Sequence, residues 1–357
     1  MDAIFDSVVV GAGQAGLSVS YHLARRGLHH VVLDANDAPG GAWQHRWDSL
    51  TMADVHGIAA LPDAARPEPA LVERANRAVP GYFSDYESTY DLPIERPVVV
   101  DRVEEGSGPE VGLLVVHAGV RRWVSRTLVN ATGTWSQPFV PHYPGAGTFG
   151  GEQLHTHDYP GPEHFRGRRT LVVGGGASAV QLLGEIAPVT ETLWVTRRPP
   201  VWRTDDFTPE VGREAVALVE ERVRRGLPPA SVVSVTGLVL RDQERAAEAL
   251  GAYRRRPMFS AIEPSGVRWD LPDHEDFGQG FEPVDVILWA TGFRPAVNHL
   301  APLHLRGPLG GIALDGTTVV ADPRVQLVGY GPSASTIGAN RAGRLAATRV
   351  ARFSMAA

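Results

Sequence analysis

Residues Ser7 to Gly16 read SVVVGAGQAG, and this stretch decides the fold that we predict for the chain. Its apolar, β-branched start is typical of a short buried strand. The turn that follows has Gly11, Gly13 and Gly16 at the spacing that lets a backbone approach a pyrophosphate at the positive N-terminus of a helix. A turn of this kind can also be an ordinary tight turn, so the residues around it must decide between the two interpretations.

The residues after the turn complete a strand–helix–strand unit. A helical stretch runs from Leu17 to Arg26, and Gly27 suits its C-terminal cap. A second apolar strand, residues 31–33, ends on Asp34, at the distance from the turn where a carboxylate can bond ribose hydroxyls. The alternative interpretation of Asp34 is a solvated acid at a strand end. Together these features predict a Rossmann-type module for an adenosine with a free 2′-hydroxyl.

The same pattern restarts in the middle of the chain. Residues 170–173 predict a strand, the turn Gly174-Gly175-Gly176-Ala177-Ser178-Ala179 follows, and residues 180–186 predict a helix. Alanine is permitted at the last position of such a turn. The next strand, residues 193–195, ends on Thr196-Arg197-Arg198 instead of an acid, and arginine can pair with a 2′-phosphate. We therefore expect NADPH in this module, although a surface basic pair is the alternative interpretation and NADH is not excluded.

Each half of the chain later repeats an Ala-Thr-Gly segment, at Ala131-Thr132-Gly133 and at Ala290-Thr291-Gly292, which makes a weak internal repeat. The tail contains one more apolar strand, residues 325–328, and a helix from about Thr336. We expect this tail to pack back on the first module. The predicted fold class is α/β, with two Rossmann-like dinucleotide-binding domains, the second inserted into the first. The first domain is expected to comprise residues 1–145 and 286–357, and the second, with its linkers, residues 146–285.

Composition excludes several other kinds of chemistry. The 357 residues contain no cysteine, and the 34 lysine and arginine residues are all arginine, so thiolate, disulfide and Schiff-base chemistry are excluded. The net charge of −6 gives no reason to expect nucleic acid or an anionic membrane as a partner. His155 and His157 lack the clustered partners of a metal site, and we expect no metal. The start of the chain has no basic region before its first strand, which predicts a cytoplasmic protein.

The stretch Phe149-Gly150-Gly151-Glu152-Gln153-Leu154-His155-Thr156-His157-Asp158-Tyr159 resembles the signature of the flavin-containing monooxygenase superfamily, the class B flavoprotein monooxygenases, in its small bacterial form. The signature positions are Phe149, Gly151, His155 and Tyr159. Two glycine-rich turns, two Ala-Thr-Gly segments and this signature follow one another in the family's order. The resemblance therefore spans nearly the whole chain.

The resemblance implies that the first module binds FAD. The segment Gly40-Gly41-Ala42-Trp43 would lie beside the flavin ring, and Gly329 with the start of the last helix would hold its ribityl and pyrimidine side. The residues expected to contact FAD are Gly11, Gly13, Gln14, Ala15, Gly16, Asp34, Ala35, Gly41, Ala42, Trp43, Val100, Ala131, Thr132, Gly133, Gly329, Thr336 and Ile337.

The second module would bind NADPH, with NADH as the weaker expectation. The residues expected to contact this nucleotide are Gly174, Gly175, Gly176, Ala177, Ser178, Ala179, Thr196, Arg197, Arg198, Ala290, Thr291, Gly292 and Phe293. In the family the signature histidine is mainly a structural and domain-coupling residue, so His155 is not assigned as an acid or base. No catalytic residue is assigned from the sequence.

The family's reaction implies that NADPH reduces FAD and that oxygen then forms a C4a-hydroperoxyflavin, whose distal oxygen passes to a small organic substrate. Tyr159, in place of the tryptophan of Baeyer–Villiger monooxygenases, favours a soft nucleophile such as sulfide sulfur or amine nitrogen, with Baeyer–Villiger oxygenation as a side activity. Residues 49–54 lack the asparagine that heteroatom-oxidising members place near the flavin. The chain is also short for the family, and a homodimer is a family-level expectation.

Two other functions remain open from the sequence. An NAD(P)H oxidase or electron-transfer flavin reductase is the main alternative, and the missing asparagine is its best support. A nucleotide-sensing or scaffold protein is the non-enzymatic alternative, although both nucleotide turns look intact. An FAD-dependent disulfide reductase is excluded because the chain has no cysteine pair.

Overall fold

The structure is a computed structural model that describes residues 3–55, 58–202, 209–229, 237–238, 240–270 and 279–356. Contacts between Cα atoms divide the chain into two compact units. The first unit comprises Met1–Trp135, Arg213–Val232 and Pro295–Ala357, and the second comprises Ser136–Gly212 and Val233–Arg294. In the sequence, both segments of the second unit therefore lie between segments of the first.

The boundaries between the units differ from the expected domain limits of 145 and 285. Residues 286–294 belong to the second unit, because strand β14 (Val286–Trp289) pairs in parallel with two strands of that unit. Residues 136–145 also belong to it, and Pro138 pairs with Phe293 in an isolated bridge. Residues 213–232 belong to the first unit, where Val223 is buried in a hydrophobic cluster. Pairing with strands that are distant in the sequence explains why the pattern along the chain did not show these limits.

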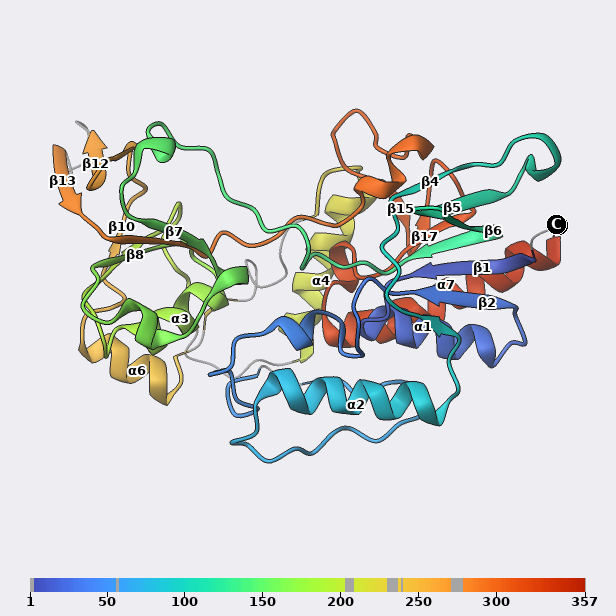
Figure 1. Ribbon diagram of the computed structural model, residues 1–357, viewed down its shortest axis with the longest axis horizontal. Coiled ribbons are helices and arrows are strands. Elements are labelled where there is room, and N and C mark those ends of the chain that lie inside the picture. The colour runs from blue at the N-terminus through green and yellow to red at the C-terminus, as the bar shows by residue number, and fades with distance from the viewer. Residues whose placement is uncertain are drawn as a thin grey trace. The chain divides into compact units, whose positions relative to one another are not determined.

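The first unit is built on a sheet that includes nine of the described strands (Figure 1). Its parallel strands follow the order β17-β6-β1-β2-β3, and antiparallel strands extend it at β17 and β6. The parallel strands are β1 Ile4–Val10, β2 His30–Leu33, β3 Ile94–Glu95, β6 Arg121–Asn130 and β17 Val325–Leu327. The antiparallel ones are β4 Arg102–Glu105, β5 Leu114–Ala118, β15 Leu314–Asp315 and β16 Thr318–Val319.

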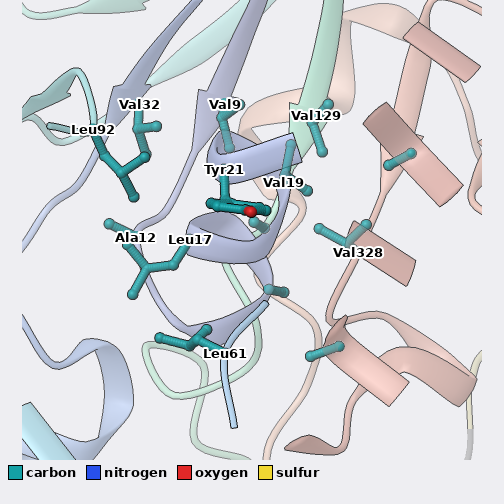
Figure 2. Close-up of a cluster of buried hydrophobic side chains, with 14 of the residues drawn as sticks. Val9, Ala12, Leu17, Val19, Tyr21, Val32, Leu61, Leu92, Val129 and Val328 are labelled. Carbon is teal, nitrogen blue, oxygen red and sulfur yellow. The ribbon is translucent and has the colours of Figure 1, made fainter. Parts of the chain in front are cut away.

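Both faces of the central strands are buried, which accounts for their continuous apolar sequences. Alternate residues such as Val9 and Val32 join one cluster, to which helix α1 (Gln14–Ala24) contributes Leu17 (Figure 2). The intervening residues, Val8 and Leu33 among them, join a second cluster. Helices α2 (Ala75–Thr89) and α7 (Thr336–Ala356) add residues to the first cluster, so the tail helix packs on the first module as expected.

The second unit is built on a parallel sheet of five described strands in the order β10-β9-β8-β14-β7. A separate three-stranded antiparallel sheet, β11-β12-β13, belongs to the same unit. The remaining strands are β7 Glu152–His155, β8 Thr170–Val173, β9 Thr192–Val195, β10 Arg255–Arg256, β11 Ala261–Glu263, β12 Gly266–Asp270 and β13 Gln279–Pro283. The helices are α3 Ala177–Ile186, α6 Asp242–Ala249 and the first residues of α4, which spans Pro209–Arg224.

The expected strands and helices around both glycine-rich turns are present, within a few residues of their predicted ends. The sequence of residues 98–103 predicts a strand, but β4 begins only at Arg102, so this prediction is wrong for residues 98–101. Helix α2 begins at Ala75 and continues through Pro80 to Thr89, so it is longer than the short helices expected up to about Pro80. Among the helices of the described ranges, none is long and apolar enough to cross a bilayer.

Candidate dinucleotide-binding sites

The first glycine-rich turn has a backbone shape that requires glycine at two positions. Gly11 has φ +100° and donates its amide hydrogen to the carbonyl of Leu33 at 2.7 Å. A Cβ on Gly11 would lie 2.7 Å from the carbonyl oxygen of Ala131, and a Cβ on Gly16 would overlap the carbonyl oxygen of Gly11. The first and last glycines of the turn are therefore required by the fold itself.

Gly13 is glycine for a different reason. It caps the N-terminus of α1 with φ −75°, which any residue can adopt, and a Cβ there would meet no atom within 4 Å. No side chain caps α1, and its first turn, with Gln14 and Ala15, carries no acid. The positive end of this helix therefore opens beside a space that the described residues do not fill. That space fits a phosphate, since helix N-termini bind anions through their backbone amides.

The second turn repeats this construction. Gly174 has φ +141° and donates its amide hydrogen to the carbonyl of Val195 at 3.0 Å, and a Cβ there would overlap the carbonyl oxygen of Ala290. Gly176 caps α3 without a side-chain hydrogen bond, and a Cβ on it would meet no atom within 4 Å. Ala179, in the place of the last glycine, is fully buried. Of the other predicted residues, Gly175 lies in the same turn, and Ala177 and Ser178 begin α3.

The two Ala-Thr-Gly segments support the turns from equivalent positions. The amide of Ala131 donates to Val10 at 2.7 Å, and the amide of Ala290 donates to Val173 at 2.8 Å, in each case the last residue of the strand before the turn. Each threonine hydroxyl donates to a carbonyl, Thr132 to Ala296 at 2.6 Å and Thr291 to Phe139. Gly133 and Gly292 follow with φ +63° and +78°. The internal repeat of the sequence is thus a repeat of structure.

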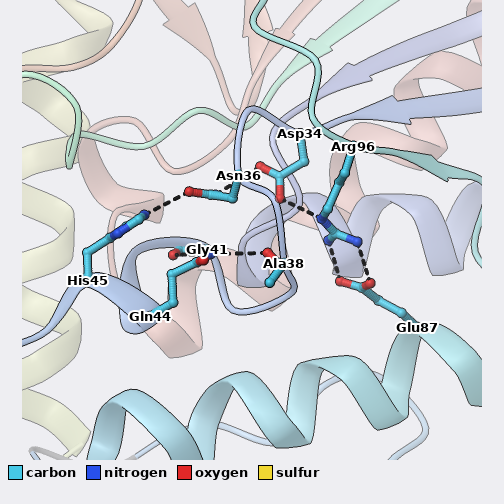
Figure 3. A network of polar contacts seen from close by, with 8 residues as sticks. All are labelled: Asp34, Asn36, Ala38, Gly41, Gln44, His45, Glu87 and Arg96. Atoms are coloured by element: carbon cyan, nitrogen blue, oxygen red, sulfur yellow. Dashed lines mark hydrogen bonds and ion pairs between the residues drawn. The ribbon is translucent and has the colours of Figure 1, made fainter.

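Asp34 lies in a network of charges that the sequence did not reveal (Figure 3). Arg96 donates from Nε to Asp34 Oδ2 at 3.0 Å and from both terminal nitrogens to Glu87, at 2.7 and 2.6 Å. Asn36 donates to Asp34 Oδ1 at 3.2 Å. The side chains of Asp34, Glu87 and Arg96 are only 5, 11 and 13% exposed. Asp34 is therefore an oriented carboxylate, as a ribose-binding acid must be.

The segment expected beside the flavin packs on the first turn. Gly41 has φ +51°, and a Cβ on it would lie 2.8 Å from Cα of Gly13. Gly41 begins a short 3₁₀ helix, Gly41–His45, which includes Ala42 and Trp43, and Trp43 packs against the first hydrophobic cluster. The structure thus brings this segment to the turn at Gly13.

The remaining residues expected to contact FAD lie in several places in the first unit, and the described contacts bring only some of them to the first turn. Gly329 has φ +69°, and a Cβ on it would lie 3.7 Å from Cα of Gly133. Thr336 and Ile337 begin α7, but their side chains lie outside the described part of the structure. Ala35 is exposed after Asp34, and Val100 packs against the second hydrophobic cluster, on the loop before β4.

At the second site, Arg197 and Arg198 follow β9 and are both exposed. The structure adds a third arginine that the sequence analysis missed. Arg255, on the neighbouring strand β10, donates from Nε to the hydroxyl of Thr196 at 3.0 Å and from Nη2 to its carbonyl at 3.1 Å. The run of three arginines at 254–256 was the available signal, but its strand pairing was not evident from spacing.

The signature residues hold parts of the second unit together. His155 accepts the amide hydrogen of His157 at Nδ1, at 3.0 Å, so its Nε2 carries the proton and donates to the carbonyl of Gly292, also at 3.0 Å. Burial lowers the pKa of His155, which favours this neutral form, and its ring packs edge-on against Phe293 at 4.9 Å. His155 is thus a structural residue in this unit.

The other signature residues also pack within the unit. The buried Tyr159 hydroxyl donates to Glu185 of α3 at 3.0 Å, and burial raises the pKa of Tyr159. Phe149 packs against the core of the unit, and its ring leaves no room for a Cβ on Gly151. Within the described ranges, no three His, Asp or Glu side chains are grouped to hold a metal ion.

A glycine-rich turn between a parallel strand and a helix is typical of dinucleotide-binding domains, and this chain has two such turns. Residues 8–228 match the pyridine nucleotide-disulphide oxidoreductase family. A flavin-containing monooxygenase from Stenotrophomonas maltophilia has a similar structure, with a TM-score of 0.83 and 34% identity, covering 99% of this chain and 100% of that one.

Two relatives carry the comparison further. An indole-3-pyruvate monooxygenase, YUCCA4 of Oryza sativa subsp. japonica, is 32% identical over 82% of this chain and 74% of its own. A Baeyer-Villiger monooxygenase of Streptomyces coelicolor is 29% identical over 90% of this chain and 63% of its own. The chain belongs to the pyridine nucleotide-disulphide oxidoreductase family and, within it, to the flavin monooxygenase superfamily. Its class is that of FAD-dependent monooxygenases that use NADPH.

Proposed function

We propose that this protein uses NADPH and oxygen to oxygenate a soft nucleophile, sulfide sulfur or amine nitrogen, on a small organic substrate. FAD, when bound, supplies the redox chemistry and the activation of oxygen. The residues of the chain bind and orient the two nucleotides. Oxygenation of a ketone by the Baeyer–Villiger route is proposed as a side activity, in keeping with the relative from Streptomyces coelicolor.

The observation that supports this proposal most is the pair of helix N-termini at Gly13 and Gly176. Each has space beside it, no side-chain cap and no need of its own for glycine. At the first, the Asp34 carboxylate oriented by Arg96 suits ribose hydroxyls and would repel a 2′-phosphate. The carboxylate at this position supports FAD at the first turn.

The second turn differs at its ribose end, where the chain has arginines in place of an acid. Arg197 and Arg198 are exposed after β9, and Arg255 is bound to Thr196 beside them. Three guanidinium groups near one strand end suit a 2′-phosphate, because guanidinium pairs with phosphate through two parallel hydrogen bonds. This supports NADPH over NADH.

Tyr159 supports a soft nucleophile as substrate only because it stands where Baeyer–Villiger monooxygenases have a tryptophan. Its hydroxyl is bonded to Glu185 and its ring is buried, so within the second unit it acts by packing and not by contact with a reacting atom. A homodimeric state and a cytoplasmic location remain predictions from the sequence.

Product analysis tests this function. The purified holoenzyme is turned over in air with NADPH and either methyl phenyl sulfide or N,N-dimethylaniline, and the oxygenated product and hydrogen peroxide are both quantified. We expect sulfoxide or N-oxide to account for most of the NADPH consumed. If all of the NADPH is converted into hydrogen peroxide, the protein is an NADPH oxidase and the proposal is wrong.

A further inference from the structure

Arg46 is a cation placed against two indole rings in the first unit. It caps the C-terminus of the 3₁₀ helix Gly41–His45 and is partly buried. Its guanidinium carbon lies 4.7 Å from the ring centre of Trp135 and 5.7 Å from that of Trp43. The ring of His45 stacks on that of Trp135, with the ring centres 6.1 Å apart and the planes nearly parallel.

The guanidinium of Arg46 has no acidic partner among the residues that the structure describes. Other arginines that lie over indole rings do have one, since Arg121 over Trp123 pairs with Glu95, and Arg256 over Trp269 pairs with Glu282. A charge taken out of water without a counter-ion is destabilising, and burial lowers the pKa of Arg46 for this reason. Arginine nevertheless stays charged at neutral pH.

The location of this cation points to a ligand as the missing partner. Trp43 follows Gly41, whose backbone packs on Gly13 of the first turn, and Trp135 follows Gly133 at the carboxyl end of β6. In parallel sheets of this type, ligands bind beyond the carboxyl ends of the strands. The phosphates of FAD already have the N-terminus of α1, so they do not need this arginine.

We infer that Arg46 binds a carboxylate carried by the organic substrate, so that the preferred substrates are flat, apolar acids with an oxidisable sulfur or nitrogen. This inference rests on the proposed function for the identity of the reaction. The guanidinium offers a planar fork of N–H donors that matches the two oxygens of a carboxylate. The indole rings of Trp43 and Trp135 make the surroundings of the guanidinium apolar, as the rest of such a molecule requires.

The probe pair for this site is (phenylthio)acetate and its neutral amide, (phenylthio)acetamide. Both are titrated into the oxidised holoenzyme without NADPH, and binding is followed by the change in flavin absorbance. We expect the acid to bind about tenfold to a hundredfold more tightly than the amide, the ratio expected for hydrogen bonds to a charged group. Equal affinity for the acid and the amide would overturn the inference.

Two variants locate the preference at this residue. In Arg46→Met the acid and the amide should bind with equal affinity. The Tm of this variant should rise, because an apolar side chain of similar length removes an unpaired charge. Arg46→Lys keeps the charge without the fork and should retain part of the ratio. The matched control is Arg121→Met, which removes a paired arginine from an indole ring and should leave the ratio unchanged.

Other results would assign Arg46 a different role. A lower Tm for Arg46→Met with an unchanged ratio would make the residue a structural contact of the indoles. A loss of FAD affinity in Arg46→Met and Arg46→Lys, with the ratio unchanged, would mean that the cation serves the cofactor. Because the titration uses oxidised enzyme, failure to oxygenate methyl phenyl sulfide would count against the proposed function and not against this site.

Discussion

The Asp34 carboxylate is held in place by hydrogen bonds from Arg96 and Asn36. Its partner Arg96 lies between two carboxylates, those of Asp34 and Glu87, so this buried group carries one excess negative charge. The distance of Asp34 from the glycine-rich turn predicted this residue. Arg96 and Glu87 could not be predicted, because their contact depends on how β3 and α2 pack beside β2, which local spacing does not encode.

Replacing Arg96 tests this network. Arg96→Met would leave the buried carboxylates of Asp34 and Glu87 without their cation, and we expect a loss of roughly 3–5 kcal/mol in the free energy of unfolding. The matched control is Arg102→Met, since Arg102 pairs with Glu104 while 52% exposed, and its loss should be below about 1 kcal/mol. Urea unfolding of the FAD-free proteins measures both values. Equal losses would show that the buried network contributes no more to the free energy of unfolding than the exposed ion pair does.

Arg197 is expected to choose between the two nicotinamide cofactors. Arg197→Ala should raise the KM for NADPH about tenfold and the KM for NADH far less, because only NADPH carries the 2′-phosphate. The control is Arg254→Ala, an exposed arginine next to the strand that carries Arg255. Steady-state kinetics with both cofactors decides the matter. Equal increases for NADPH and NADH would contradict the assignment.

His299 makes stability depend on pH. Its Nε2 lies 2.7 Å from Oδ1 of Asn130, whose amide donates to Thr132 at 2.9 Å, and burial lowers the pKa of His299 to about 4. Below pH 6.5 the unfolded chain binds a proton at this position while the folded protein does not, so stability falls as the pH drops from 6.5 toward 4.

The matching experiment compares wild type with His299→Gln. Between pH 7 and pH 5 the wild-type protein should lose up to about 2 kcal/mol through this histidine, a loss that the variant should lack. His22, whose pKa burial also lowers to about 4, contributes in the same direction in both proteins and cancels in the comparison. Identical pH profiles would show that His299 is not held neutral.

At the scale of elements, the regular units were the ones that could be predicted. Apolar runs followed by glycine-rich turns predicted β1, α1, β8 and α3 because each satisfies a local rule of strand, turn and helix. The full length of helix α2 was not predicted, because only short helices were expected up to about Pro80, whereas the helix continues through this proline to Thr89. The signature forms the edge strand β7, which was also not predicted, since only its pairing with β14 defines it as a strand.

The two kinds of glycine in the first turn should respond differently to one added methyl group. Gly16→Ala should destabilise the FAD-free protein by roughly 1–3 kcal/mol, since its Cβ would overlap Gly11. Gly13→Ala should leave that stability nearly unchanged and weaken FAD binding at least about tenfold, because its Cβ points into space that only a ligand would occupy. Urea unfolding and FAD titration separate the two. Unaltered FAD affinity in Gly13→Ala would mean that the phosphate lies elsewhere.

At the scale of the whole molecule, the chain contains one construction twice. Each unit has its own buried core and its own glycine-rich turn supported by an Ala-Thr-Gly segment. The repeat was visible in the sequence, but the limits of the units were not, because β14 and residues 213–232 join elements that are distant along the chain. Two nucleotide sites of this kind on one chain account for a flavin that is reduced by a nicotinamide cofactor.

The most direct test is the anaerobic reduction of bound FAD by NADPH in wild type and in Gly176→Ala, followed by loss of the yellow flavin absorbance. The variant should keep its FAD content, because Gly176 belongs to the second turn alone. As a control, photoreduction of its bound flavin in the absence of NADPH should proceed as in wild type. The variant should need at least about tenfold more NADPH for half the maximal rate, since a Cβ would enter the space left for the phosphate. The same dependence on NADPH in both proteins would contradict the assignment of two nucleotide sites.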